Sequence, residues 1–125
     1  MFTDLKILHT ASLLARHSVQ RHSLVAENIA NADTPGYKAK DLEPFAEAFA
    51  KSERAQMDAR ASGFAQQAFH AQKIETGGIA SPDGNTVSLE DQMTRSTASV
   101  RDHETALTVY SKALAMMRAT LGNRG

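Results

Sequence analysis

Residues 28–38 read Asn28-Ile29-Ala30-Asn31-Ala32-Asp33-Thr34-Pro35-Gly36-Tyr37-Lys38, and the chain changes character along this stretch. Pro35 fixes its own φ and disfavours the α region at Thr34, so a helix cannot continue through this pair. Pro followed by Gly suits the two central positions of a type II turn, because Gly accepts the positive φ needed at the second. Asn31 and Asp33 can bond the backbone groups left free at a helix end. The stretch therefore predicts a helix terminus followed by a tight turn.

The segment before this turn has the pattern of one long helix, from about Thr3 to Asn31. Thr3 is a suitable N-cap, and Asp4 places a negative charge in the first turn, where the helix dipole favours it. At 1.5 Å per residue the helix would be roughly 40 Å long. Steps of three and four residues define a heptad seam of apolar and small side chains, with polar interruptions. Its positions are Leu5, Leu8, Ser12, Ala15, Val19, His22, Ala26 and Ile29.

A second long helix begins near Ser88, where Ser88-Leu89-Glu90-Asp91 resembles a capping box with Asp in place of the usual Glu or Gln. Gly122 is a natural residue to follow its end. This helix would be roughly 50 Å long. Its heptad seam consists of Met93, Ser96, Val100, His103, Leu107, Tyr110, Leu114, Met117 and Leu121.

Neither long helix can bury its apolar stripe alone. The simplest arrangement is an all-α fold in which the two terminal helices pair as an antiparallel coiled coil, with a short helix and an irregular segment between them. The predicted organisation is an N-terminal helix and turn over 1–37, a short helix and flexible segment over 38–86, and a C-terminal helix over 87–125 that forms one structural unit with the first. A pair of helices still exposes apolar surface, which is typical of a partner site and favours an assembly subunit over a self-sufficient enzyme.

The middle of the chain begins with an extended segment over residues 38–40. A short helix follows, capped by Asp41 or Glu43 and ending near Ser52. The spacing places Leu42, Phe45 and Phe49 on one face of it.

Residues 53–82 carry no clean periodicity, and Gly and Pro residues punctuate the stretch up to residue 86. Phe64, Phe69 and Ile74 are isolated apolar residues that could dock on something. A segment of this length in a small domain is usually functional or disordered. We therefore expect a mobile segment that orders against a partner.

Composition narrows the class of protein further. The chain has 125 residues with 14 basic and 14 acidic side chains, so it has no field that would attract nucleic acid or an anionic membrane. It has no Cys, which excludes disulfides and thiolate metal sites. It has no apolar run long enough for a transmembrane helix and no apolar core of a cleaved signal peptide near its start. If the protein leaves the cytoplasm, we expect it to do so without such a signal.

Candidate catalytic residues find no supporting motif. Ser, His and Asp occur without a nucleophile elbow, and the glycines near residue 77 lack the Lys of a phosphate-binding loop. Asp83-Gly84-Asn85 lacks the further acidic residues of a calcium loop. His22 and His103 both lie on the seams, where a metal-bridging or pH-sensitive pair is one interpretation and a register-setting polar residue is the stronger one. The sequence predicts no enzyme activity, no cofactor, no metal and no small-molecule substrate.

The stretch at 28–38 resembles the N-terminal motif of the bacterial flagellar basal body rod and hook family, in which a long helix ends in an N-[LIVM]-A-N-x-x-T-P-G-[YF] turn. The matching positions here are Asn28, Ile29, Ala30, Asn31, Thr34, Pro35, Gly36 and Tyr37, with Asp33 inside the motif. Residues 83–93, Asp83-Gly84-Asn85-Thr86-Val87-Ser88-Leu89-Glu90-Asp91-Gln92-Met93, are similar to a D-G-N-x-V-x-L-E-x-E-M run of the smaller rod proteins. Gln92 stands where Glu is common, and Ser99 and His103 stand where rod proteins often carry Asn and Tyr.

The resemblance implies a structural subunit of the flagellar rod, the axial shaft that links the membrane ring to the hook and transmits torque. Its implied partners are copies of itself, other rod proteins, the ring and adaptor proteins at the rod base, and the flagellar type III export apparatus. Its implied location is the periplasmic rod of the basal body. We expect the seam residues to contact neighbouring subunits and Tyr37 to anchor the turn against one. A helical export chaperone or adaptor is the alternative.

Overall fold

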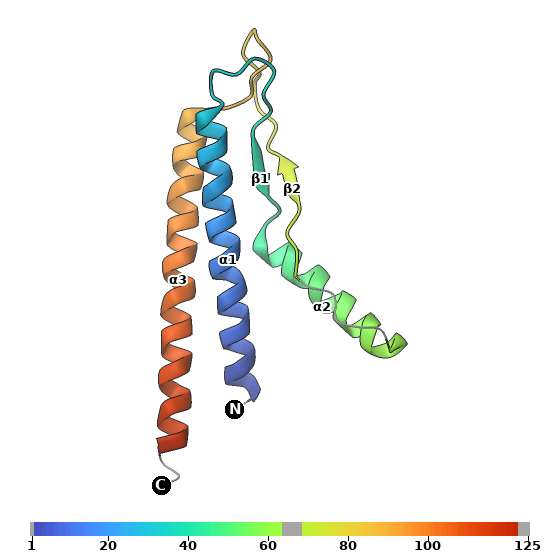
Figure 1. Ribbon diagram of the computed structural model, residues 1–125, viewed down its shortest axis with the longest axis vertical. Coiled ribbons are helices and arrows are strands. Elements are labelled where there is room, and N and C mark those ends of the chain that lie inside the picture. Colours follow the sequence, from blue (N-terminus) through green and yellow to red (C-terminus); the bar gives the residue numbers. More distant parts are fainter. Residues whose placement is uncertain (1, 64–68, 123–125) are drawn as a thin grey trace.

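The computed structural model describes residues 2–63 and 69–122. Within them the chain forms α1 (Phe2–Ala30), β1 (Lys40–Leu42), α2 (Phe45–Ser62), β2 (Lys73–Glu75) and α3 (Leu89–Gly122). The long helices α1 and α3 lie side by side and run antiparallel, so the start of α1 and the end of α3 lie at one end of the pair and the turns lie at the other (Figure 1). The predicted all-α fold with two long, paired terminal helices is therefore confirmed. None of the helices in these residues is long and apolar enough to cross a membrane.

Small side chains line the contact between the two long helices. Ala11, Ser18 and Val25 are buried on α1 at intervals of seven residues, and α3 buries Gln92, Ser99, Ala106 and Ala113 at the same interval. A line of Ala and Ser lets two helix backbones approach closely, because little side-chain volume stands between them.

About half of the predicted seam positions, such as Val19 and Val100, therefore lie one residue further along each helix than the buried line. Eight large side chains of the predicted seam are exposed in the single chain, from 39% for Tyr110 to 68% for Met93: Leu5, Val19, Ile29, Met93, Val100, Leu107, Tyr110 and Leu121. Leu8, Leu114 and Met117 are partly buried. Within one chain the helices meet mainly through their smallest side chains, whereas the predicted seam followed the largest apolar ones. The use of the seam between subunits stays a prediction.

Helix α2 is longer than its sequence pattern indicated. It continues past Ser52 to Ser62 because residues 53–62 are mostly good helix formers, and it ends at Gly63, whose φ of 74° allows its N–H to bond the carbonyl oxygen of Ala59. Its N-cap is Pro44, with no side-chain capping bond. The carboxylates of the expected caps Asp41 and Glu43 instead bond to arginine and lysine side chains, as described below.

The strands β1 and β2 form an antiparallel ribbon that the sequence did not predict. Lys40 pairs with Glu75, and Leu42 pairs with Lys73. Each strand has only three residues, too few for an alternating pattern to stand out. The ribbon lies beside α1 and shows that part of the expected mobile segment pairs with the chain that leaves the turn (Figure 1).

A small apolar core joins these elements on the side of α1 away from α3. Leu24 of α1, Leu42 of β1 and Ala48 of α2 are buried there together with Ala71, and Phe69 packs against them. The ring of Phe45 stacks on Phe49 at 5.7 Å between centroids and lies 5.5 Å from Phe69. Phe69, one of the three isolated apolar residues, therefore packs against the rest of the chain. Ile74 is 43% exposed on β2. Phe64 lies outside the described residues.

Candidate functional site

The motif at 28–38 forms the predicted helix end and turn. Helix α1 ends at Ala30, and the N–H of Tyr37 bonds the carbonyl oxygen of Thr34 at 3.2 Å across Pro35 and Gly36. Gly36 has a φ of 73°, which is the value expected at the second central position of a type II turn. The local prediction is confirmed at each of these positions.

Asn28 is the centre of the site. Its side chain is completely buried, and its Nδ2 group donates to the carbonyl oxygen of Lys40 at 2.7 Å and to Oε1 of Gln92 at 2.9 Å. Its Oδ1 accepts from the Tyr37 hydroxyl and from the Lys40 N–H, both at 3.1 Å. All four bonding positions of the amide are thus used, and one side chain joins α1 to the turn, to β1 and to α3.

Asn85 makes the second connection, from the segment before α3. Its Nδ2 donates to the carbonyl oxygens of Asn31 at 2.9 Å and Thr34 at 2.8 Å, so it binds the backbone of the turn. Its Oδ1 accepts from the Val87 N–H at 2.8 Å, and its own N–H donates to Asp83 at 3.0 Å. Asn85 is 2% exposed, so this connection is buried as well.

The two loops also meet through their backbones. The Gly36 N–H donates to the Asp83 carbonyl oxygen at 3.0 Å, and a Cβ placed on Gly84 would lie 3.5 Å from the Gly36 Cα. Lys38 Nζ donates to the Gly84 carbonyl oxygen at 2.7 Å. We call the contact of residues 28–40 with residues 83–92 the clasp. The two stretches singled out separately in the sequence are therefore two halves of one intrachain structure.

The remaining motif residues divide between the clasp and the surface. Asn31 Nδ2 donates to the Glu27 carbonyl oxygen at 2.8 Å, and its Oδ1 accepts from the Thr34 hydroxyl at 3.1 Å, so it closes the end of α1. The side chains of Ile29, Ala30, Asp33 and Pro35 are exposed.

Tyr37 differs from its expected role as an anchor for a neighbouring subunit. Its hydroxyl bonds Asn28 inside the same chain, and its side chain is half-buried. Burial, with a smaller contribution from the nearby Glu27 carboxylate, raises the pKa of the Tyr37 hydroxyl above its usual value. The structure therefore gives the hydroxyl an intrachain partner, and contact with a neighbour stays a prediction.

A buried carboxylate attaches β1 to both long helices, and the sequence analysis missed it. Asp41 is 4% exposed, and Arg21 of α1 donates from Nε to its two oxygens at 3.1 and 3.2 Å. Arg95 of α3 also donates to Asp41 and bonds Asp91 at 2.8 Å. Burial opposes the charge of Arg95, but its bonds to Asp91 and Asp41 outweigh that cost and raise its pKa. Arg21 lies seven residues before Asn28 and therefore on the same face of α1. This spacing could indicate the contact only once the pairing of the helices was known.

A second contact holds the end of the ribbon. His17 of α1 is 3% exposed and bonds the Glu43 carbonyl oxygen through Nε2 at 2.9 Å, with its ring edge against Phe45. The Glu43 carboxylate accepts from Lys51 at 2.6 Å. Asp41 and Glu43 thus serve to fix the segment before α2, which explains why neither caps that helix.

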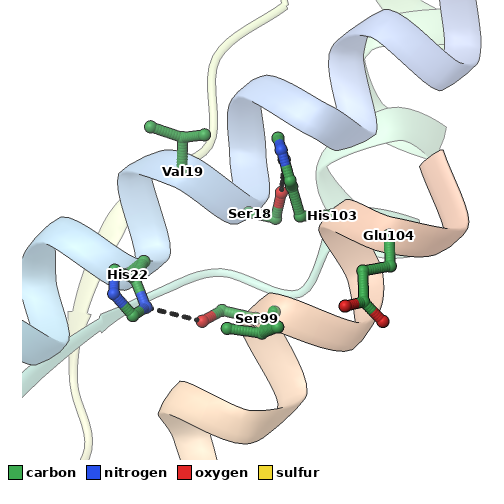
Figure 2. A pocket seen from close by; sticks show the side chains of 7 residues that line it. Ser18, Val19, His22, Ser99, His103 and Glu104 are labelled. Carbon is green, nitrogen blue, oxygen red and sulfur yellow. Dashed lines mark hydrogen bonds between the residues drawn. The ribbon is translucent and has the colours of Figure 1, made fainter. Parts of the chain in front are cut away.

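The seam histidines form reciprocal pairs between the helices. His22 Nδ1 lies 3.3 Å from Ser99 Oγ, and His103 Nδ1 lies 3.3 Å from Ser18 Oγ (Figure 2). Each serine hydroxyl donates to its own helix backbone, so each imidazole N–H must donate to the hydroxyl. A pocket of about 270 Å³ lies between the pairs and has Val19, Val100 and Glu104 in its lining.

The interpretation of His22 and His103 as a metal-bridging pair finds no third ligand nearby in the described residues. No three His, Cys, Asp or Glu side chains in residues 2–63 and 69–122 gather closely enough to hold a metal ion. The positions at which α3 departs from the family pattern are Gln92, Ser99 and His103, and all of them bond to α1 across the interface. Polar contacts are therefore present at each of these positions despite the departures.

These features define a class of protein: an elongated helical subunit, closed at one end by a polar clasp and carrying exposed apolar side chains along its length. The family described as flagella basal body rod protein matches residues 20–38, which contain the end of α1 and the turn. The flagellar basal body rod protein FlgB of Salmonella typhimurium strain LT2 is 29% identical to the chain over 116 residues, covering 82% of this chain and 83% of the Salmonella protein.

Both comparisons show similarity to flagellar basal body rod proteins, and the Salmonella relative is a protein of the FlgB type. The matched family consists of structural components of the flagellar basal body.

Proposed function

We propose that this chain is a structural subunit of the flagellar basal body rod, which it builds by helix packing and without enzyme activity. The observation that carries the proposal is the clasp, in which both rod-type sequence stretches bind each other through Asn28 and Asn85. The clasp joins the long helices at one end, and their exposed side chains are left for neighbours. The rod as an axial shaft then transmits torque from the membrane ring to the hook.

The exposed apolar residues support intersubunit packing. Val19 and Val100 are 56% and 46% exposed and line the pocket between the helices, and Leu107 is 52% exposed further along α3. Exposing large apolar side chains along a helix pair is unfavourable in a monomer, and covering them is a driving force for association. In the proposal, copies of this chain and other rod proteins cover these residues, and ring and adaptor proteins contact the subunits at the rod base.

The proposal also includes delivery and location. The subunit would pass through the flagellar type III export apparatus without a cleaved signal peptide and assemble in the periplasmic part of the basal body. In the proposal the chain is exported unfolded, so its clasp and its helix pair would form only after export.

A matched pair of substitutions on α3 tests the assembly role. In cells that lack this gene, we expect a Leu107→Glu chain to be made and helical but to give few intact rods in electron micrographs and little swimming. Thr108→Glu, at the next exposed position, adds the same charge without removing a large apolar side chain and should assemble normally. Normal rods and swimming with Leu107→Glu would contradict the proposed use of the exposed residues.

A helical export chaperone or adaptor is the second candidate, because the same exposed apolar residues could bind helices of other proteins. Such a protein would be a stable, fully helical dimer at micromolar concentration. A rod subunit should instead be largely monomeric and partly disordered when free. Size-exclusion chromatography with circular dichroism on the purified chain separates the two.

A further inference from the structure

The interface between α1 and α3 combines a line of small side chains with hydrogen bonds between the helices. The small residues recur every seven positions, with Ala11 and Ser18 on α1 and Ser99, Ala106 and Ala113 on α3. Small side chains allow close approach but interlock weakly. A slip of α3 by seven residues, about 10 Å at 1.5 Å per residue, would place Ala106 where Ser99 lies and leave the line almost unchanged.

The hydrogen bonds do not tolerate the same slip. In the observed register Asn28 bonds Gln92 at 2.9 Å, His22 bonds Ser99 at 3.3 Å and Ser18 bonds His103 at 3.3 Å. After the slip, His22 would face Ala106, which has no side-chain acceptor. A slip in the opposite direction would bring Asn85, which precedes the helix, to the level of Asn28. Asn28 and Gln92 are both buried, so a slip that separates them leaves buried polar groups without this partner, which is costly. His22 is exposed, so the loss of its bond adds a smaller penalty.

We propose that these three polar links set the register of α1 against α3, whereas the line of small residues sets only the distance between the helices. The links lie from the clasp to the middle of the pair, and the Ser–His links are reciprocal because each helix supplies one Ser and, four residues later, one His (Figure 2). A single polar residue at a helix interface is known to specify register in coiled coils. The register in turn decides which exposed apolar residues of the two helices lie together, and this consequence alone rests on the proposed function.

Distance measurement between spin labels tests the proposal on the full chain. The chain has no Cys, so Arg16→Cys and Arg118→Cys, both at exposed positions, allow specific labelling. The two sites are well separated along the pair, so a slip changes their distance by up to about 10 Å. The parent should give one main distance. Adding Ser18→Ala, Asn28→Ala and Ser99→Ala removes all three links and keeps the side chains between the helices small. A second population of distances, corresponding to a slip of seven residues, should then appear.

Ala106→Leu in the same labelled chain is the matched control, since it enlarges one residue of the line and keeps every link. It should push the helices apart slightly and give one population close to the parental distance. A single parental distance in the variant without links, with its helices intact, would overturn the proposal. Loss of helices in that variant would overturn it too, because the links would then hold the pair together. A heptad-displaced population in Ala106→Leu would show that packing sets the register. None of these outcomes depends on a role in the rod.

Discussion

At the scale of single residues, the buried amide of Asn28 joins four parts of the chain. Replacing it with Ala removes four hydrogen bonds and leaves the Lys40 backbone groups and Gln92 without this partner. Because a buried polar group left unsatisfied costs about 1–3 kcal/mol, Asn28→Ala should lower the free energy of unfolding by about 2–4 kcal/mol. Urea denaturation measures the change. Asn31→Ala, whose side-chain bonds lie at the exposed helix end, is the control and should cost clearly less.

Gly36 is required for its backbone conformation rather than for space. Its φ is 73°, yet a Cβ placed there would meet nothing within 4 Å. Gly36→Val should therefore block rod assembly through backbone strain, since a β-branched residue resists positive φ. Gly36→Asn, which tolerates this conformation better, should assemble to a greater extent. Counting rods in electron micrographs and measuring swimming gives the comparison, and wild-type motility with Gly36→Val would remove the turn from the mechanism.

Tyr37 makes the clasp sensitive to alkaline pH. Burial and the Glu27 carboxylate raise its pKa in the folded chain, so folding favours the neutral phenol. This contribution to stability is fully present below the unfolded value of about 10 and is lost as the pH rises through the higher folded value. The wild type should lose more stability between pH 8 and strongly alkaline pH than Tyr37→Phe does. Parallel denaturation curves of the two proteins measure this difference, and equal losses would contradict the account of Tyr37.

At the scale of elements, Asp41 determines where the ribbon lies. Asp41→Asn removes the negative charge that Arg21 and Arg95 share, and each arginine side chain is less than a third exposed. Breaking a buried ion pair costs about 3–5 kcal/mol, and partial exposure reduces this to about 2–3 kcal/mol here. Amide hydrogen exchange should accelerate at Lys73–Glu75, which pairs with β1. Asp102→Asn, at an exposed carboxylate 4.0 Å from Arg21, is the control and should leave that exchange unchanged.

The elements that the sequence predicted are those set by local chemistry. Pro35 and Gly36 determine the turn by themselves, and Ser88 caps α3 by accepting from the Asp91 N–H at 3.3 Å, as its position indicated. The line of small residues between the helices was not predicted because periodicity finds large apolar residues, whereas residues such as Ser99 and Ala106 are buried there. The ribbon and the Asp41 contacts were missed because they join segments far apart in the chain. The clasp likewise combines two motifs whose proximity neither motif encodes.

At the scale of the whole molecule, the chain resembles a hairpin with a closed end. Asn28 and Asn85 close it, the ribbon and α2 attach to one side of α1, and α3 presents Val100 and Leu107 outward. This arrangement accounts for how a chain of 125 residues without Cys can be ordered at one end and still expose large apolar side chains along its length. The exposed residues then acquire a physical role only when neighbouring subunits cover them.

Electron cryomicroscopy of intact basal bodies from cells that make this protein tests the central claim most directly. The account predicts rod density that fits this chain, with α1 and α3 paired in the observed register, the clasp closed, and Val100 and Leu107 covered by neighbouring subunits. Basal bodies whose complete rod contains no density for this chain would contradict it. Rod density in which these side chains face solvent would contradict the proposed packing.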